Sequence, residues 1–141
     1  MESNLQAMPI NLISPTNVEP HPVVEKIFAA DGALDLESFL ALLTPDIVLR
    51  IGSQPELQGH AAVSMAITGM FAMMRSGIRH TLHQQWQSDN VLIYEATAEF
   101  FLKDGRDITL PYVNVLSVES DERVSQYKIY IDLSPLNPMS H

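Results

Sequence analysis

The chain has 141 residues, of which 46% are hydrophobic and 18% charged, a composition typical of one globular domain. Seventeen acidic and eight basic residues give a net charge of −9. No segment carries a cluster of Lys or Arg that could contact the phosphate backbone of a nucleic acid, so nucleic-acid binding is not expected. The lack of cysteine excludes disulfides, thiolate metal sites and thiol catalysis. Apolar runs are far shorter than the roughly 20 residues that cross a bilayer, so no membrane partner is expected.

The first 18 residues mix Pro, Asn and Ser with scattered apolar residues and show no steady period. We therefore predict a flexible N-terminal arm at 1–18, one domain at 19–136 and a short tail at 137–141. No basic region followed by an apolar run marks the N-terminus for secretion, so we expect a cytoplasmic protein.

Apolar residues recur at helical spacing in three segments that precede the last third of the chain. Asp35 is the expected N-cap of the second helix, and the third carries a methionine-rich stripe that is typical of a core. A short β-branched run favours a strand between the second and third helices. The expected helices are 19–30, 36–43 and 61–74, and the expected strand is 46–51.

Four consecutive strands are predicted between Ile78 and Leu133. Turn signals at 88–90, 103–105 and 120–122 separate them, and residue character alternates with period two along each strand. Helices gathered on one face of a curved antiparallel sheet form an α+β sandwich. We therefore predict a cone-shaped sandwich of a mostly antiparallel sheet, with about three N-terminal helices packed over a pocket.

Cross-strand pairing about the two tightest turns separates the faces of this sheet. Ala96 and Ala98 lie in the middle of the inner face, where a packed core favours bulk, and therefore suggest a cavity. In the last strand, apolarity assigns Tyr127, Ile129 and Ile131 to the inside. The rest of the face assigned to the interior consists of His80, Leu82, Gln84, Trp86, Tyr94, Phe100, Leu110, Tyr112 and Asn114.

Polar residues on the inner face are the candidates for chemistry. His80 is a candidate general acid–base because an imidazole titrates near neutral pH, and the alternative is a histidine hydrogen-bonded at the strand start. His83 would point to the opposite side of the strand, so no shared metal site is expected. Tyr112, Asn114 and Tyr127 each need a partner when buried, which a ligand, one another or ordered water can supply.

Four other positions leave alternatives open. Trp86 and Tyr94 either pack in the core or recognise a ligand. Arg50, at a strand end, either attracts an anionic substrate or offsets the acidic surface. Asp132 would be a desolvated base if it pointed inward, but we favour an outward orientation at the chain end or at a dimer contact.

Three segments carry a family resemblance: GHAAV at 59–63, KDGRDITLPYVNVLSV at 103–118 and YKIYIDLSPL at 127–136. With the order of elements, they resemble the nuclear transport factor 2-like superfamily, and within it the SnoaL-like polyketide cyclase group that is related to ketosteroid isomerases. The resemblance implies a cone with a deep pocket and frequent homodimers. It also implies functions from isomerases, cyclases and hydrolases to non-catalytic binders.

The resemblance further implies catalytic residues, several of which this chain lacks. Limonene-epoxide hydrolases use an Arg-x-Asp pair that falls on Ala96 and Ala98 here, and a further Asp that falls on Ile129. The base of ketosteroid isomerases falls at 50–52, where no carboxylate stands. SnoaL-like cyclases use acid–base residues from the sheet, a role for which the candidates here are His80, Tyr112, Tyr127 and Asp132.

The sequence thus predicts a SnoaL-like pocket protein that needs no cofactor and binds a hydrophobic small molecule. It is either a cofactor-independent isomerase or cyclase acting on a polyketide-, terpenoid- or steroid-like substrate, or a non-catalytic carrier. A domain that mainly dimerises, with a collapsed pocket, is a third hypothesis. The candidate ligand-binding residues are Arg50, Gln84, Trp86, Tyr94, Ala96, Ala98, Asn114 and Ile129.

Overall fold

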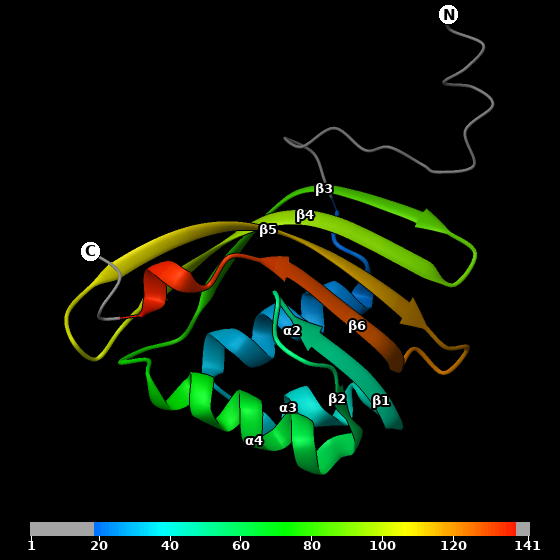
Figure 1. Cartoon of the computed structure of the whole chain (residues 1–141). Helices are drawn as coiled ribbons and strands as arrows, with labels where there is room; N and C mark the ends of the chain where they lie inside the picture. The colour runs from blue at the N-terminus through cyan, green and yellow to red at the C-terminus, as the bar shows by residue number, and fades with distance from the viewer. Residues whose placement is uncertain (1–18, 138–141) are drawn as a thin grey trace, which may run out of the picture.

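A six-stranded sheet curves over the helices in the computed structural model, which describes residues 19–137 (Figure 1). The strand order is β2-β1-β6-β5-β4-β3, and all neighbours are antiparallel except β1 and β6. This arrangement confirms the predicted α+β cone. The strands are β1 (Leu43–Ile51), β2 (Leu57–Gln58), β3 (Arg79–Ser88), β4 (Val91–Phe101), β5 (Asp107–Val118) and β6 (Val124–Ile131).

Three helices lie on one side of the sheet (Figure 1): α2 (Pro22–Ala33), α3 (Leu36–Ala41) and α4 (Gly59–Ala72). Helix α2 continues three residues past its predicted end and stops at Leu34, which adopts a left-handed φ of 50°. Asp35 caps α3 as predicted, since its Oδ1 accepts the Ser38 backbone N–H at 3.1 Å.

The core fills the space between the two layers. Val23 and Ile27 of α2, and Val63 and Ile67 of α4, are at most 3% exposed. Each pair is four residues apart, so both side chains fall on the helix face turned to the sheet. Burying each such side chain contributes about 1.5–3 kcal/mol, which holds the helices against the inner face.

Strand β3 contains a bulge that the alternation of residue types did not predict. Leu82 pairs with Ala96 and Gln84 pairs with Glu95, so no residue of β4 pairs with His83. Because side chains alternate with period two, one extra residue reverses the two faces from there to the end of the strand.

The predicted inward orientation of Gln84 and Trp86 is therefore wrong. Both lie on the outer face, and Gln85 is the residue buried against the helices. Its Oε1 accepts the backbone N–H of His21 at 2.9 Å, at the start of α2. The bulge thus ties the N-terminal helix to the sheet.

The hairpin between β4 and β5 shifts the predicted pairing by two residues. Pairing about the turn at 104–105 predicts that Ala96 lies opposite Asn114, whereas Ala96 pairs with Tyr112 and the ladder ends at the pair Phe101 and Asp107. A shift of two keeps every side chain on its face. The predicted inner face of β4 and β5 is therefore correct although its register is not.

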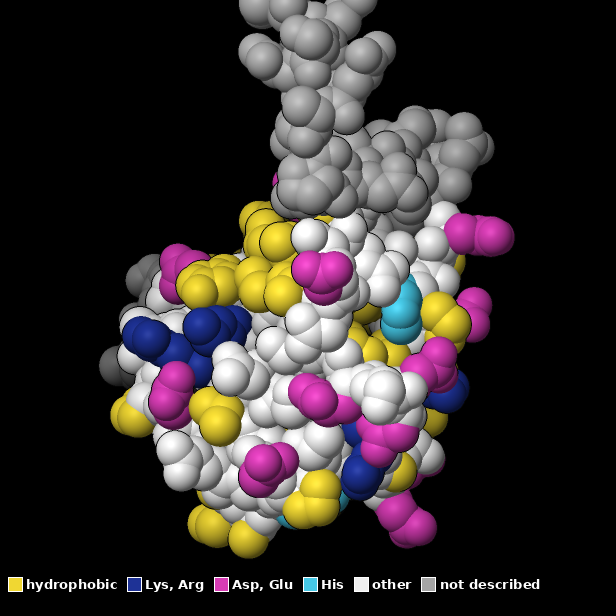
Figure 2. All heavy atoms as spheres, turned by 90° about the vertical axis from the view of Figure 1, so that its right-hand side faces the viewer, with side chains coloured by type: hydrophobic (Ala, Val, Ile, Leu, Met, Phe, Trp, Pro, Cys, Tyr) yellow, Lys and Arg dark blue, Asp and Glu magenta, His cyan; other side chains and the backbone are white. Residues whose placement is uncertain are grey.

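The predicted arm and residues 138–141 of the predicted tail lie outside the described residues. Within the described part, no helix is both long and apolar enough to span a bilayer. Figure 2 shows acidic side chains spread over the face in view, with smaller groups of Lys and Arg side chains between them.

Candidate functional site

A cavity of about 50 Å³ lies between the inner face of the sheet and the helices. Aliphatic and aromatic side chains form most of its wall, with a few polar groups among them. The wall consists of Asp31, Ile51, Met70, Ile78, His80, Ala98, Phe100, Tyr112, Asn114, Tyr127, Ile129, Ile131 and Leu133.

Three polar side chains of this wall form one hydrogen-bonded chain. The Asp31 Oδ2 lies 2.8 Å from Nε2 of His80, and Nδ1 of the same ring lies 2.6 Å from the Tyr112 hydroxyl. The side chains of Asp31 and His80 are only 15% and 9% exposed. Largely shielded from water, a carboxylate, an imidazole and a phenol thus meet at the cavity wall.

Helix α2 places two of the contacts to His80. Phe28 and Asp31 lie three residues apart on one face of the helix. The Phe28 ring stacks on the imidazole with ring centroids 4.6 Å apart and an angle of 9° between planes. The ring is therefore held by packing on its face and by hydrogen bonds at both nitrogens.

The contact between His80 and Tyr112 crosses over strand β4. His80 pairs with Ala98, and Tyr112 pairs with Ala96. Strands β3 and β5 are about 9.5 Å apart, because each lies one strand spacing from β4. The two rings can meet above β4 because its inward residues there are alanines. The predicted gap at Ala96 and Ala98 is thus spanned in part by this contact.

Hydrogen bonding assigns the resting tautomer of His80. A carboxylate only accepts, so the proton lies on Nε2 and is donated to Asp31, while Nδ1 accepts from the Tyr112 O–H. Burial, and then repulsion from an ionised Tyr94 and from the Asp31 carboxylate, raise the pKa of Tyr112 well above its usual range. A lasting tyrosinate is therefore disfavoured, and proton loss from Tyr112 must be coupled to proton gain.

A second polar group lies deeper on the same face. The Asn114 Nδ2 donates to the Tyr94 hydroxyl at 2.8 Å, and the Tyr127 hydroxyl donates to that of Tyr94. Burial raises the pKa of Tyr94 to about 12 and that of Tyr127 well above its usual range. All three side chains are buried. Both phenols are therefore neutral hydrogen-bonding groups at neutral pH.

The structure brings most of the predicted site residues together. His80, Ala98, Tyr112, Asn114, Tyr127 and Ile129 line the cavity, while Tyr94 and Ala96 are buried beside it. Gln84 and Trp86 are separated from the cavity by the bulge described above.

Arg50 and Asp132 also lie away from the cavity. Arg50 is exposed and pairs with Lys128 across β1 and β6, so it does not stand at the cavity wall. Asp132 points outward as favoured, where its carboxylate accepts the Ser134 backbone N–H at 3.0 Å. This bond lowers the pKa of Asp132, the opposite of what an inward carboxylate would show.

Asp31 is the residue of the hydrogen-bonded chain that the sequence patterns did not single out. The predicted helix 19–30 ends just before Asp31, which the structure places in the last turn of α2. A signal was present, because a carboxylate in the last turn of a helix faces the negative end of the helix dipole, where basic residues are favoured.

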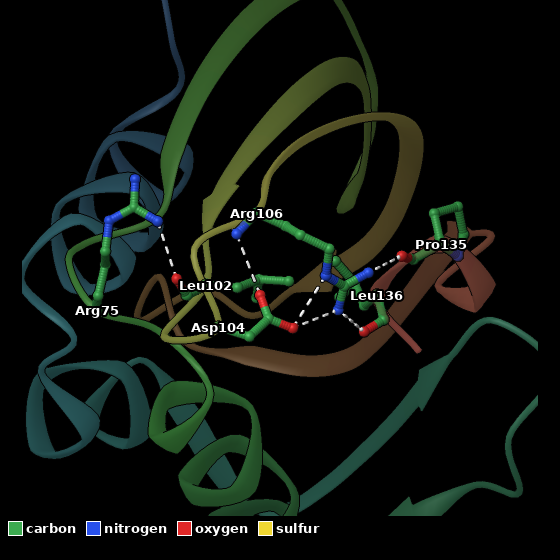
Figure 3. Close-up of polar contacts among 6 residues, drawn as sticks. All are labelled: Arg75, Leu102, Asp104, Arg106, Pro135 and Leu136. Atoms are coloured by element: carbon green, nitrogen blue, oxygen red, sulfur yellow. Dashed lines mark hydrogen bonds and ion pairs between the residues drawn. The ribbon is translucent and has the colours of Figure 1, made fainter. Parts of the chain in front are cut away.

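The C-terminal segment adjoins the cavity and is held from the β4–β5 hairpin. Leu133 is part of the cavity wall and directly precedes the short helix η2 (Ser134–Leu136). Figure 3 shows Arg106 reaching this helix, with Nη1 donating to the Pro135 carbonyl at 3.0 Å and Nη2 to that of Leu136 at 2.8 Å. Asp104 orients the guanidinium by accepting from Nε at 2.9 Å. This contact fastens one edge of the cavity.

Among the residues that the structure describes, no three His, Cys, Asp or Glu side chains come close enough to hold a metal ion.

Solved structures with the same fold cover most of the chain. A protein of ketosteroid isomerase-like fold from Catenulispora acidiphila, in complex with trimethylamine, is 16% identical and covers 82% of this chain and 89% of its own, with a TM-score of 0.73. An LEH-like epoxide hydrolase of M. tuberculosis is 18% identical and covers 79% of this chain and 80% of its own, with a TM-score of 0.66. A proposed polyketide cyclase from Pseudomonas putida is 20% identical over 79% and 90%, with a TM-score of 0.64. At these identities the likeness shows the fold.

Sequence comparison defines the family more closely than the structures do. No curated protein matches the chain significantly. The family model described as the SnoaL-like domain matches residues 24–127, which are most of the chain. The chain therefore belongs to the SnoaL-like domain family.

Proposed function

We propose that the protein is a cofactor-independent acid–base catalyst of the isomerase or cyclase type, acting on a small, largely apolar molecule. The observation that carries this proposal is the hydrogen-bonded chain from Asp31 through His80 to Tyr112, which ends at the cavity. A buried carboxylate–imidazole pair behind a hydroxyl is an arrangement that moves protons without a metal or cofactor.

The two protonation states of His80 give Tyr112 two roles. With the imidazole neutral, the Tyr112 O–H points to Nδ1 and its lone pairs are free to take a proton from a ligand C–H next to a carbonyl. The ligand proton then passes to the Tyr112 oxygen while the phenol proton passes to Nδ1, which leaves an enolate and an imidazolium. Asp31 stabilises that imidazolium, and the reverse transfer returns a proton to another carbon of the ligand.

Tyr127 is proposed as the group that polarises the ligand carbonyl. Its side chain lines the cavity, and its raised pKa keeps the hydroxyl protonated, so the O–H can turn from the Tyr94 hydroxyl to the ligand carbonyl. Asp132, Arg50, Gln84 and Trp86 have no role in this proposal because they lie outside the cavity.

The size of the cavity restricts the ligand. A dry protein cavity of about 150 Å³ takes up benzene, whereas this one measures about 50 Å³. We therefore place either a small compound or the reacting end of a polyketide-, terpenoid- or steroid-like molecule inside it. A polycyclic ligand would enter fully only after its wall had moved at Met70 or Leu133.

Deuterium exchange tests the proposal without the natural substrate. Cyclopentanone in D₂O is followed by ¹H NMR, and we expect the wild type to speed exchange of its α-protons over buffer. Tyr112→Phe and His80→Phe should each lower that rate at least about 100-fold, with folding checked by circular dichroism. A rate that is unchanged in both variants would remove the assigned roles.

A non-catalytic carrier is the second candidate function. It is favoured by the raised pKa values of Tyr94, Tyr112 and Tyr127, since neutral phenols can bind a ligand without exchanging protons with it. A carrier would bind cyclopentanone with no incorporation of deuterium, and the same experiment therefore separates the two functions.

We also propose a homodimer formed through the outer face of the sheet. The described helices cover only the inner face (Figure 1), and Tyr130 on the outer face is 58% exposed. Val113 and Val115 lie beside it on β5 and are paired with Tyr130 and Lys128. Sedimentation velocity should give a dimer for the wild type and a monomer for Val115→Glu, and a monomeric wild type would refute the proposal.

A further inference from the structure

Asn114 lines the cavity, and only the nitrogen of its side-chain amide forms a hydrogen bond with the described part of the chain. Its Nδ2 donates to the Tyr94 hydroxyl at 2.8 Å, and the side chain is 2% exposed. Among the described residues, its Oδ1 has no hydrogen-bond partner. A buried carbonyl oxygen without a partner is uncommon and costs free energy, so the site is incomplete without a donor.

Its position in the sheet directs Asn114 toward the cavity. The residue lies on the inner face of β5, between Tyr94 of β4 and Ile129 of β6. Both Asn114 and Ile129 are part of the cavity wall. The donor that Oδ1 lacks is therefore expected from the cavity rather than from the protein.

The charges of the cavity restrict what this donor belongs to. Among the described residues that line it, Asp31 is the only carboxylate and none is a Lys or an Arg. An anionic ligand would be repelled by Asp31 and find no cation, while the aliphatic wall around Ile129 and Ile131 disfavours a strongly hydrated ligand.

We infer that Asn114 is a specificity-determining residue, whose Oδ1 accepts a hydrogen bond from a hydroxyl or N–H group of a small neutral ligand. This inference rests on the proposed function in one respect, since it concerns the same cavity. It adds a requirement on the ligand: besides the part that reacts at Tyr112, the buried portion carries a hydrogen-bond donor and no negative charge.

Pyrrole and furan test the inference as a matched pair. Both are neutral five-membered rings that are smaller than benzene, and only pyrrole has an N–H donor. In ¹H–¹⁵N NMR titrations, we expect wild-type protein to bind pyrrole at least about fivefold more tightly than furan. Shifts are expected at the Asn114 side-chain amide and at backbone amides of the cavity wall.

Two variants complete the test. Asn114→Leu keeps the size of the side chain but removes the acceptor, and its preference for pyrrole should fall to about one. Ile129→Val shortens the apolar side chain that is paired with Asn114 on β6. This variant should change the affinities for pyrrole and for furan while keeping their ratio. If Asn114→Leu does not fold, the ratio of the pyrrole and furan affinities of the wild type still tests the inference.

Equal affinities in the wild type, as when a held water satisfies Oδ1, or no binding of either compound in the cavity would overturn the inference. A wild type that prefers pyrrole but exchanges no deuterium would overturn the proposed catalysis and leave the inference standing. If the wild-type protein exchanges deuterium but shows no preference for pyrrole, the inference about Asn114 is overturned and the proposed catalysis stands.

Discussion

The Asp31 carboxylate and the His80 imidazole are 49 residues apart in the chain and 2.8 Å apart in space. One comes from the last turn of α2 and the other from the first residues of β3. Their contact joins the helical layer to the sheet at the wall of the cavity, and four predictions follow from it and from its surroundings.

Replacing Asp31 by Asn is expected to lower the rate of deuterium exchange at least about 100-fold, with little change in ligand affinity. The neutral amide cannot stabilise an imidazolium and no longer selects the Nε2–H tautomer of His80. Long-range ¹H–¹⁵N NMR of the histidine rings should show that tautomer in the wild type and a mixture in the variant.

Asp35→Asn is the matched control for this change. Asp35 lies four residues further along the chain, is exposed, and caps α3, and Asn caps helices about as well as Asp. Its exchange rate should equal that of the wild type. Full exchange activity in the Asp31→Asn protein would contradict the proton relay.

Enlarging Ala98 to Val is expected to separate His80 from Tyr112. Ala98 is 1% exposed and lies on β4 below their contact, so two added methyl groups would enter the space in which the two rings meet. We expect destabilisation of about 1–3 kcal/mol in urea unfolding and loss of deuterium exchange.

Thr97→Val serves as the control, since Thr97 is the neighbouring residue on the outer face and the change keeps side-chain size. It loses only the 3.3 Å contact to His83. An Ala98→Val protein that is destabilised but exchanges at the wild-type rate would show that the alanine is not needed for the contact.

Alkaline pH is expected to destabilise the fold through its buried phenols. The pKa of Tyr94 is about 12 in the folded protein, against about 10 in an unfolded chain. Below pH 10 both states hold the proton and the full stability is present. Between pH 10 and 12 the unfolded chain loses it first, so stability falls by roughly 3 kcal/mol for Tyr94 alone.

The pKa values of Tyr112 and Tyr127 are raised as well, and they act in the same direction. Urea unfolding at a series of pH values from about 8 to 12 measures the loss, and Tyr94→Phe should make it smaller. Stability that stayed constant between pH 10 and 12 would be incompatible with three buried, protonated phenols.

Arg106→Gln is expected to loosen the C-terminal edge of the cavity. The variant loses the two bonds to the Pro135 and Leu136 carbonyls. Amide hydrogen exchange at Leu136 and Asn137, whose N–H groups bond within η2, should speed up at least about tenfold.

Arg123→Gln provides a matched control because the same turn recurs there. Arg123 bonds to Asp121 through its backbone N–H at 3.1 Å and its Nε at 2.8 Å, as Arg106 does to Asp104. Those bonds stay within its own turn, so the variant should leave exchange in η2 unchanged. Equal exchange in both variants would mean that Arg106 does not hold the segment.

Much of the fold was predictable because its signals are local. Asp35 was identified as a cap from residue type and position alone, and the four strands from period-two alternation and turn residues. The inward orientation of Tyr127 and Ile129 followed from apolarity. The predicted register of the β4–β5 hairpin differs from the structure by two residues. The predicted inner and outer faces are still correct, because side chains alternate along a strand with a period of two.

The bulge at His83 was not predictable in the same way. Nothing in the run from Leu82 to Trp86 marks one residue as unpaired. Gln85 becomes an inner residue only because the start of α2 offers the His21 N–H as its partner. Gln84 and Trp86 were misplaced because that partner is distant in the sequence.

The sequence by itself determined the elements, the two-layer architecture and the polar residues on the inner face, since these depend on periodicity and on residue type over short stretches. The tertiary structure decided which of them meet. Asp31 reaches His80 only because α2 packs across the start of β3, and His80 reaches Tyr112 only because Ala96 and Ala98 leave the space above β4 open. Such contacts depend on how the two layers pack and on the space that small neighbouring side chains leave. Neither can be predicted from the residues that make the contact.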